Sequence, residues 1–164
     1  MLKFWTHDIP HEMYRNRSMM ILSLSIFLIS TIIGIASTLG DEHFPVQIMG
    51  QGYIDMTLEN IKNGDPMAVY SFGDSNDMMI GITLNNIGVS FMAYVSGMLT
   101  CFFTAMLLLT NGVMLGTFLT FCYQQGVLYE CMMAVWMHGV IEISSIIIAG
   151  GAGLTLGKGW LFPG

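Results

Sequence analysis

The stretch "WMHGVIEISS" at residues 136–145 places a histidine and a glutamate four positions apart in an otherwise apolar run. Residues four apart lie on one face of an α-helix, so His138 and Glu142 are expected to point the same way. One chemistry that suits such a pair is a buried clamp that joins helices by hydrogen bonds. The other is a relay that passes protons or ions. We expect the clamp and keep the relay as the alternative.

The acid of this pair needs a partner under either interpretation. A charged glutamate at the centre of a bilayer costs about 2.5–3.5 kcal/mol on insertion scales, so Glu142 is expected to face protein, to be protonated or to accept a hydrogen bond. His138 is the nearest candidate donor. The side chains that could complete the clamp are Asn85, Asn86, Asn111 and Ser145.

Neither metal binding nor catalysis is predicted from these residues. A zinc site needs three or four ligands, and the HxxxE pattern supplies two. An intramembrane protease needs a paired-acid motif on another helix or a Gly-x-Ser motif near a histidine, and we find neither. We therefore expect no enzyme activity, no metal and no cofactor.

The composition indicates a membrane protein. Of the 164 residues, 54% are hydrophobic and 10% are charged, whereas soluble domains have about 25% charged residues. Residues 78–129 contain no Asp, Glu, Lys or Arg, which excludes a water-exposed element of a small soluble domain. The net charge of −6 and the lack of a basic stripe argue against nucleic acid as a partner.

The first membrane span is predicted at residues 18–39, an uncharged run rich in Ile and Leu. Lys3, Arg15 and Arg17 precede it in the flank 1–17, whereas the following segment, 40–78, contains seven acidic residues and one lysine. Positive charge favours the cytoplasmic side of a membrane. We therefore expect a multi-pass protein of the bacterial cytoplasmic membrane with a cytoplasmic N-terminus and an external acidic segment.

The external segment contains a short amphipathic helix. Ile54, Leu58 and Ile61 recur at helical spacing, and charged residues take another face. This helix is expected to lie as a cap on the membrane surface or on the other helices. A docking surface for a partner protein is the alternative that the pattern leaves open.

Three further segments complete an all-α, polytopic fold with three to four membrane segments. Residues 79–110 are predicted to form the second span with a lead-in, its crossing at about 88–109. Asn111-Gly112 reads as a turn, after which 111–129 spans or re-enters the membrane. Residues 131–157 form the last span and contain the HGxxE motif. We favour four spans, which would return Lys158 to the cytoplasm.

Small side chains four positions apart predict close helix contacts. Such ridges let backbones approach each other in lipid, and Gly112 with Gly116 forms a GxxxG pair. The other predicted ridge residues are Ala93, Gly97, Cys101, Ala105, Ala149, Gly153 and Gly157. Since Cys101, Cys122 and Cys131 are odd in number and lie in apolar stretches, we expect them to be packing residues without a disulfide.

Two strings resemble the signature region of the stage II sporulation protein M family of prokaryotic integral membrane proteins: "NGVMLGTF" and "WMHGVIEISSIIIAGGAGLTLGKGWLFPG". "GDPMAVY" and "ITLNNIGVSF" resemble the form found in Bacteroidetes-type bacteria. The core of the resemblance is HGxxE followed by a glycine-rich apolar run that ends in PG. Members of this type usually have a soluble N-terminal region and further membrane helices after the position of Gly164, so we expect a shortened member or a fragment.

The resemblance implies a role in membrane assembly. In spore formers the named member belongs to a membrane complex with cell-wall hydrolases, but relatives occur in organisms that never sporulate, so a sporulation role is not carried over. We predict a scaffold or subunit of a membrane protein assembly in the bacterial cell envelope. Its expected partners are membrane lipids and other membrane proteins or copies of itself. The alternative is a transport or proton-coupled subunit that uses His138 and Glu142.

Overall fold

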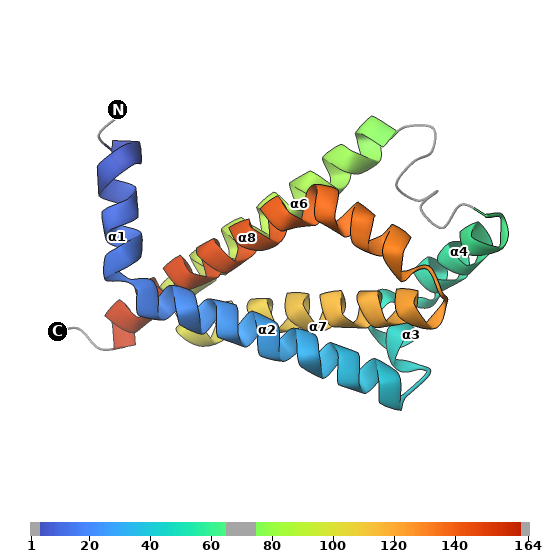
Figure 1. The fold of residues 1–164 in the computed structure, drawn as a ribbon. Helices are drawn as coiled ribbons and strands as arrows, with labels where there is room; N and C mark the ends of the chain where they lie inside the picture. Colours follow the sequence, from blue (N-terminus) through green and yellow to red (C-terminus); the bar gives the residue numbers. More distant parts are fainter. Residues whose placement is uncertain (1–3, 65–74, 162–164) are drawn as a thin grey trace.

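The described residues of the chain fold into a series of helices (Figure 1). The computed structural model describes the backbone of residues 4–64 and 75–161, and the side chains of these residues except at positions 4, 5, 75–83, 85, 134–138, 160 and 161. The helices are η1 (Phe4–Asp8), α1 (Ile9–Arg15), α2 (Arg17–Gly40), α3 (Phe44–Met49), α4 (Gln51–Lys62), α6 (Ser75–Leu99), α7 (Cys101–Gln124) and α8 (Leu128–Leu161). No strand occurs in these two described ranges, which confirms the predicted all-α class.

Three helical segments in the described part are long and apolar enough to cross a membrane: Arg17–Gly40, Cys101–Gln124 and Gly139–Gly159. Asn86–Leu99 in α6 is a shorter apolar segment. The polytopic helical membrane fold expected from the sequence is therefore confirmed, with three long segments and a shorter fourth.

The four long helices, α2, α6, α7 and α8, form two parallel pairs, which follow from their contacts. In the first pair, Thr31 of α2 lies at Gly116 of α7, and further along both helices Gln124 donates a hydrogen bond to the carbonyl of Thr38. In the second pair, α6 and α8 run side by side in the same direction (Figure 1). The two pairs meet where α7 and α8 run antiparallel, because Leu108 contacts Gly150 and Cys101 contacts Gly157.

The second predicted crossing, at about residues 88–109, is wrong in its position. Helix α6 ends at Leu99, and the backbone of Thr100 is extended (φ −160°, ψ 152°) before α7 begins at Cys101. Asn111-Gly112 lies inside α7 and makes no turn. The predicted segments 79–110 and 111–129 therefore divide at Thr100 instead, and α7 is a full-length apolar helix.

The bundle has two distinct ends. At the first, which we call the Thr100 end, α2 begins, α6 meets α7, and α8 reaches Lys158. At the other, the α3–α4 end, Met49 of α3 and Tyr53 of α4 pack against a buried cluster of Phe118, Cys122 and Cys131 beside the turn between α7 and α8. Helix α4 buries Ile54 and Thr57 there and exposes Asp55 and Glu59. It thus caps the other helices, as its amphipathic pattern predicts.

Candidate functional site

Glu142 of α8 accepts a hydrogen bond from Asn86 of α6. The amide Nδ2 of Asn86 lies 2.8 Å from Oε2 of the glutamate, and both side chains are partly buried. The two residues are 56 positions apart in the chain, so the bond joins two separate helices. A carboxylate inside a bundle thereby gains a polar partner from the neighbouring helix, as its burial requires.

The hydrogen bond lies near the start of an apolar segment in each of the two helices. Asn86 is 13 residues from the end of α6 at Leu99, which places it about 20 Å along the helix from the Thr100 end. Asn86 is the first residue of the apolar segment Asn86–Leu99, and Glu142 lies three positions after the start of the apolar segment Gly139–Gly159. The bond therefore joins the two helices near the ends of these segments that lie away from Thr100.

The predicted ridges of α6 and α8 face each other. Their contacting residues are 56 positions apart in the chain, as Asn86 and Glu142 are. Gly97 lies against the backbone of Gly153, and Cys101, just after the break, lies against Gly157. A Cβ atom added at Gly97 would collide with the carbonyl of Gly153. The absence of side chains here is thus what brings the two helices close enough for Asn86 to reach Glu142.

The other predicted members of the polar cluster do not meet Glu142 in the hydrogen bonds that the structure shows. Asn111 donates to the carbonyl of Leu107, and Ser145 donates to the carbonyl of Ile141, each within its own helix. The side chains of His138 and Asn85 lie outside the described residues. The sequence offered His138 as the nearest donor, but the donor that the structure shows comes from a different helix.

Glycines also form the contact between α2 and α7. Gly112 and Gly116, the predicted GxxxG pair, lie against the backbone of α2 at Phe27 and Thr31. On the opposing surface, Gly34 lies against the carbonyl of Val113. The GxxxG pair therefore packs within this chain, as the ridge of α6 and α8 does.

Sequence reasoning missed the stripe of α2 that meets these glycines. Its members are buried and recur every three or four residues: Ser23, Phe27, Ser30, Gly34 and Thr38. Ser23 additionally donates from Oγ to the carbonyl of Ile147 in α8, at 2.7 Å. The signal was present in the helical spacing of small and hydroxyl residues in an otherwise large-residue span.

Two further residues anchor the break at Thr100. Thr104 is fully buried near the start of α7, and its hydroxyl donates to the carbonyl of Ala93 at 3.0 Å. Ala93, a predicted ridge residue, is itself fully buried. Ala149, the equivalent ridge residue of α8, is partly buried. The α6–α7 connection is thus held by a side chain of α7 on the backbone of α6.

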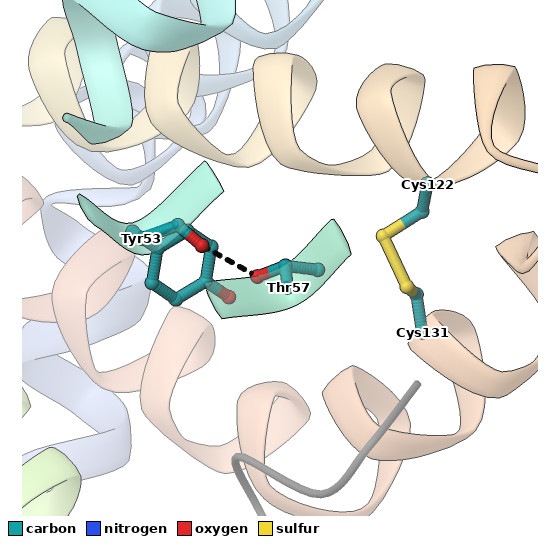
Figure 2. Close-up of a disulfide and its surroundings, with 4 residues drawn as sticks. All are labelled: Tyr53, Thr57, Cys122 and Cys131. Carbon is teal, nitrogen blue, oxygen red and sulfur yellow. Dashed lines mark hydrogen bonds between the residues drawn. A yellow bond between two sulfur atoms is a disulfide. The ribbon is translucent and has the colours of Figure 1, made fainter. Parts of the chain in front are cut away.

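The structure contradicts the expectation that no disulfide forms. Cys122 in the last turn of α7 and Cys131 in the first turn of α8 are bonded to each other across a short turn (Figure 2). Gly126 adopts a positive φ of 74° in that turn, which reverses the chain and places the two cysteines opposite each other. Counting three cysteines and noting their apolar surroundings missed the turn between two of them.

A metal ion has no evident site in the described part of the chain. Among the residues for which side chains are described, no group of three or more His, Cys, Asp or Glu residues comes together. Glu142 itself has an amide as the partner shown. The chemistry that this arrangement supports is therefore hydrogen bonding between helices.

Comparisons with known proteins agree with this helical membrane architecture. No curated protein and no solved structure matches the chain. The family model described as Stage II sporulation protein M matches residues 23–163, a range that includes most of α2, the Asn86–Glu142 pair, both glycine contacts and the disulfide. The chain therefore belongs to the stage II sporulation protein M family.

Proposed function

We propose that this chain is a subunit or scaffold of a membrane protein assembly in the cytoplasmic membrane of a bacterium. The observation that carries the proposal is the Asn86–Glu142 hydrogen bond, which uses the acid of the HGxxE motif to join α6 to α8. The glycine contacts on both sides of the bundle support the same conclusion, because they make a tightly packed unit. Such a unit is suited to holding other proteins in place.

The surface that we assign to partner proteins is the exposed side of α4. Ile54 and Thr57 hold the helix on the bundle, while Asp55, Glu59 and Lys62 remain exposed. The α3–α4 end thus exposes charged side chains on a helix whose other face packs on the bundle. The lipid-facing sides of the long helices are apolar, with exposed residues such as Ile32, Phe102 and Ile141.

The orientation that we propose places the N-terminus in the cytoplasm. Arg15 and Arg17 flank the start of α2, and Lys158 lies exposed at the same end of the bundle. Such a cluster favours the cytoplasmic side. The disulfide lies at the opposite end, and disulfides persist in oxidising compartments such as the periplasm. Two independent features therefore support the same orientation.

The proposed function is tested with two variants of Glu142 in the tagged full-length protein. Glu142→Gln keeps the shape and an acceptor oxygen, so we expect wild-type amounts of folded protein and of co-purified partners. Glu142→Ala leaves the Asn86 amide without this acceptor, at a typical cost of ~1–3 kcal/mol, and we expect both amounts to fall. Pull-down from native membranes, with the partners identified, measures both.

The same experiment separates assembly from proton-coupled transport. A relay needs a group that gains and loses a proton, and an amide does not do this at accessible pH. If Glu142→Gln assembles fully but fails to restore growth or envelope integrity in the native bacterium, the assembly role is contradicted.

The proposed partner surface on α4 is tested with a double variant, Asp55→Lys and Glu59→Lys. We expect it to lose its partners while remaining folded, because both side chains are exposed.

A further inference from the structure

The N-terminal helical segment stands apart from the bundle. Helices η1 and α1 together cover residues 4–15, and α1 has no buried residue. The chain bends at Asn16 (φ −100°, ψ 19°) before α2 begins. Figure 1 shows α1 running across the direction of α2 instead of continuing it. This segment also precedes the family match, which begins at residue 23.

The segment separates apolar from polar side chains. At 100° per residue, the apolar and aromatic side chains of α1 fall on one half of the helix, and the charged and imidazole side chains of α1 and of the end of η1 fall on the other. The first half contains Ile9, Pro10, Met13 and Tyr14. The second half contains His7, Asp8, His11, Glu12 and Arg15. Such a division is typical of a helix that lies between an apolar and an aqueous phase.

The polar half pairs with itself. Arg15 lies 2.7 Å from Glu12, His7 lies 3.3 Å from Asp8, and the rings of His7 and His11 stack. These side chains are exposed, so they are arranged for water. The apolar half, in contrast, has no core to enter, since Tyr14 is 68% exposed and Ile9 and Met13 are only partly covered.

We propose that residues 4–15 form an interfacial helix that lies on the lipid headgroups of the leaflet entered by α2, with the Ile9–Met13 side turned into the membrane. The lipid surface is the occupant because it begins at this point. Helix α2 starts at Arg17, and Ile21, one turn further on, is 60% exposed on a membrane-spanning segment. Lipid that covers Ile21 therefore extends directly to α1.

The junction carries groups typical of a membrane interface. The guanidinium of Arg17 lies over the ring of Tyr14, 4.6 Å from its centroid. Tyrosine and arginine are favoured at the headgroup level, where an apolar body meets lipid and a polar tip meets water. This stacked pair at the bend thus fixes the level at which the chain leaves the interface and enters the bilayer.

The test compares two faces of α1 in the full-length protein in phosphatidylcholine nanodiscs. A nitroxide label is placed at Met13→Cys or His11→Cys in a Cys101→Ser background, with the Cys122–Cys131 disulfide kept oxidised. The collision accessibility to oxygen, which concentrates in lipid, and to a polar nickel complex, which stays in water, is measured by power saturation. A label at Ile21→Cys serves as the lipid reference, and a label at Lys62→Cys serves as the water reference. Lipid-like accessibility at the first and water-like accessibility at the second also report that the protein is folded.

We expect the oxygen-to-nickel accessibility ratio at position 13 to exceed that at position 11 by about threefold, because an interfacial helix buries one face and exposes the other. The value at position 13 should approach that at Ile21. Water-like values at both positions would overturn the proposal, since the helix would then stand in solution. Low accessibility to both reagents at position 13 would also overturn it, because protein and not lipid would cover that face.

Discussion

The two parallel helix pairs of this bundle use glycine in the same way and differ in what their polar side chains bond to. Both α2–α7 and α6–α8 bring backbones together at glycines. At the α2–α7 contact, Ser30 donates to the carbonyl of Ile26 and Thr38 to that of Gly34, each within α2. The bond shown between these two helices runs from the Gln124 amide to a backbone carbonyl. Between α6 and α8, an amide donates across the interface to a carboxylate.

This difference follows from what each group can find locally. A hydroxyl reaches the carbonyl four residues earlier in its own helix, so it needs no neighbour. A carboxylate only accepts when ionised, and the backbone N–H groups in the middle of a helix are already bonded to carbonyls. Glu142 therefore needs a side-chain donor, and the bond that it accepts from Asn86 links α6 to α8.

The largest expected effect comes from filling the glycine contacts, which should disturb both pairs alike. Gly97→Leu and Gly116→Leu each place a side chain where the neighbouring backbone lies, so we expect a loss of about 3 kcal/mol or failure to fold. Gly88→Leu is the matched control on α6, since nothing lies within 4 Å of a Cβ at that position. Yields of folded protein measure the effect, and equal yields for Gly88→Leu and Gly97→Leu would contradict it.

The disulfide should have the next largest effect, and it acts on neither parallel pair. It joins α7 to α8 with a sequence separation of 9. Replacing both cysteines by serine should lower the free energy of unfolding by roughly 2 kcal/mol, as expected for a short closed loop. Reversible unfolding in bicelles measures this value. Unchanged stability of the double variant, with the wild-type disulfide verified by mass spectrometry, would show that the bond is not needed.

A smaller effect is expected from Asn86→Ala, which removes the donor and leaves the Glu142 carboxylate less well satisfied. We expect a loss of about 1 kcal/mol, as is typical of a hydrogen bond between membrane helices. Asn111→Ala is the control, because its amide donates only within α7 in the hydrogen bonds shown, and we expect less than about 0.5 kcal/mol there. If Asn111→Ala destabilised the protein more than Asn86→Ala, the comparison between the two kinds of polar contact would be wrong.

The smallest effect is expected at Thr38, whose hydroxyl donates to a carbonyl of its own helix. Thr38→Val keeps the shape and removes the bond to the carbonyl of Gly34, which still accepts its helical N–H. The free energy of unfolding should therefore change by no more than about 0.5 kcal/mol. A loss as large as that of Asn86→Ala would mean that a hydroxyl bonded within its own helix stabilises the protein as much as a bond between helices.

The sequence predicted the class of fold and the glycine ridges because these follow from composition and helical spacing. Uncharged runs of about 20 residues identify spans. Ridge residues such as Gly112 and Gly116, or Gly153 and Gly157, stand out because they are four positions apart. The break at Thr100 could not be predicted in this way. No proline or glycine marks it, and an uncharged run gives no sign of where one helix stops and the next begins.

Of the two residues in the candidate site, the acid could be predicted from the sequence and its partner could not be singled out. Glu142 is noticeable because it is a lone acid in an apolar run. Asn86 comes from a helix 56 positions earlier, and it was one of several amides with no local signal to distinguish it. Which amide meets the acid depends on the alignment of α6 with α8, and the close contact of Gly97 with Gly153 sets that alignment.

The most direct test of the clamp is a double-mutant cycle on Asn86 and Glu142. The free energy of unfolding is measured in bicelles for the wild type, Asn86→Ala, Glu142→Ala and the double variant. If the two side chains stabilise the bundle by bonding to each other, the cost of the double variant should fall short of the summed single costs by about 1 kcal/mol. Single costs that add to within about 0.3 kcal/mol would contradict a clamp between α6 and α8.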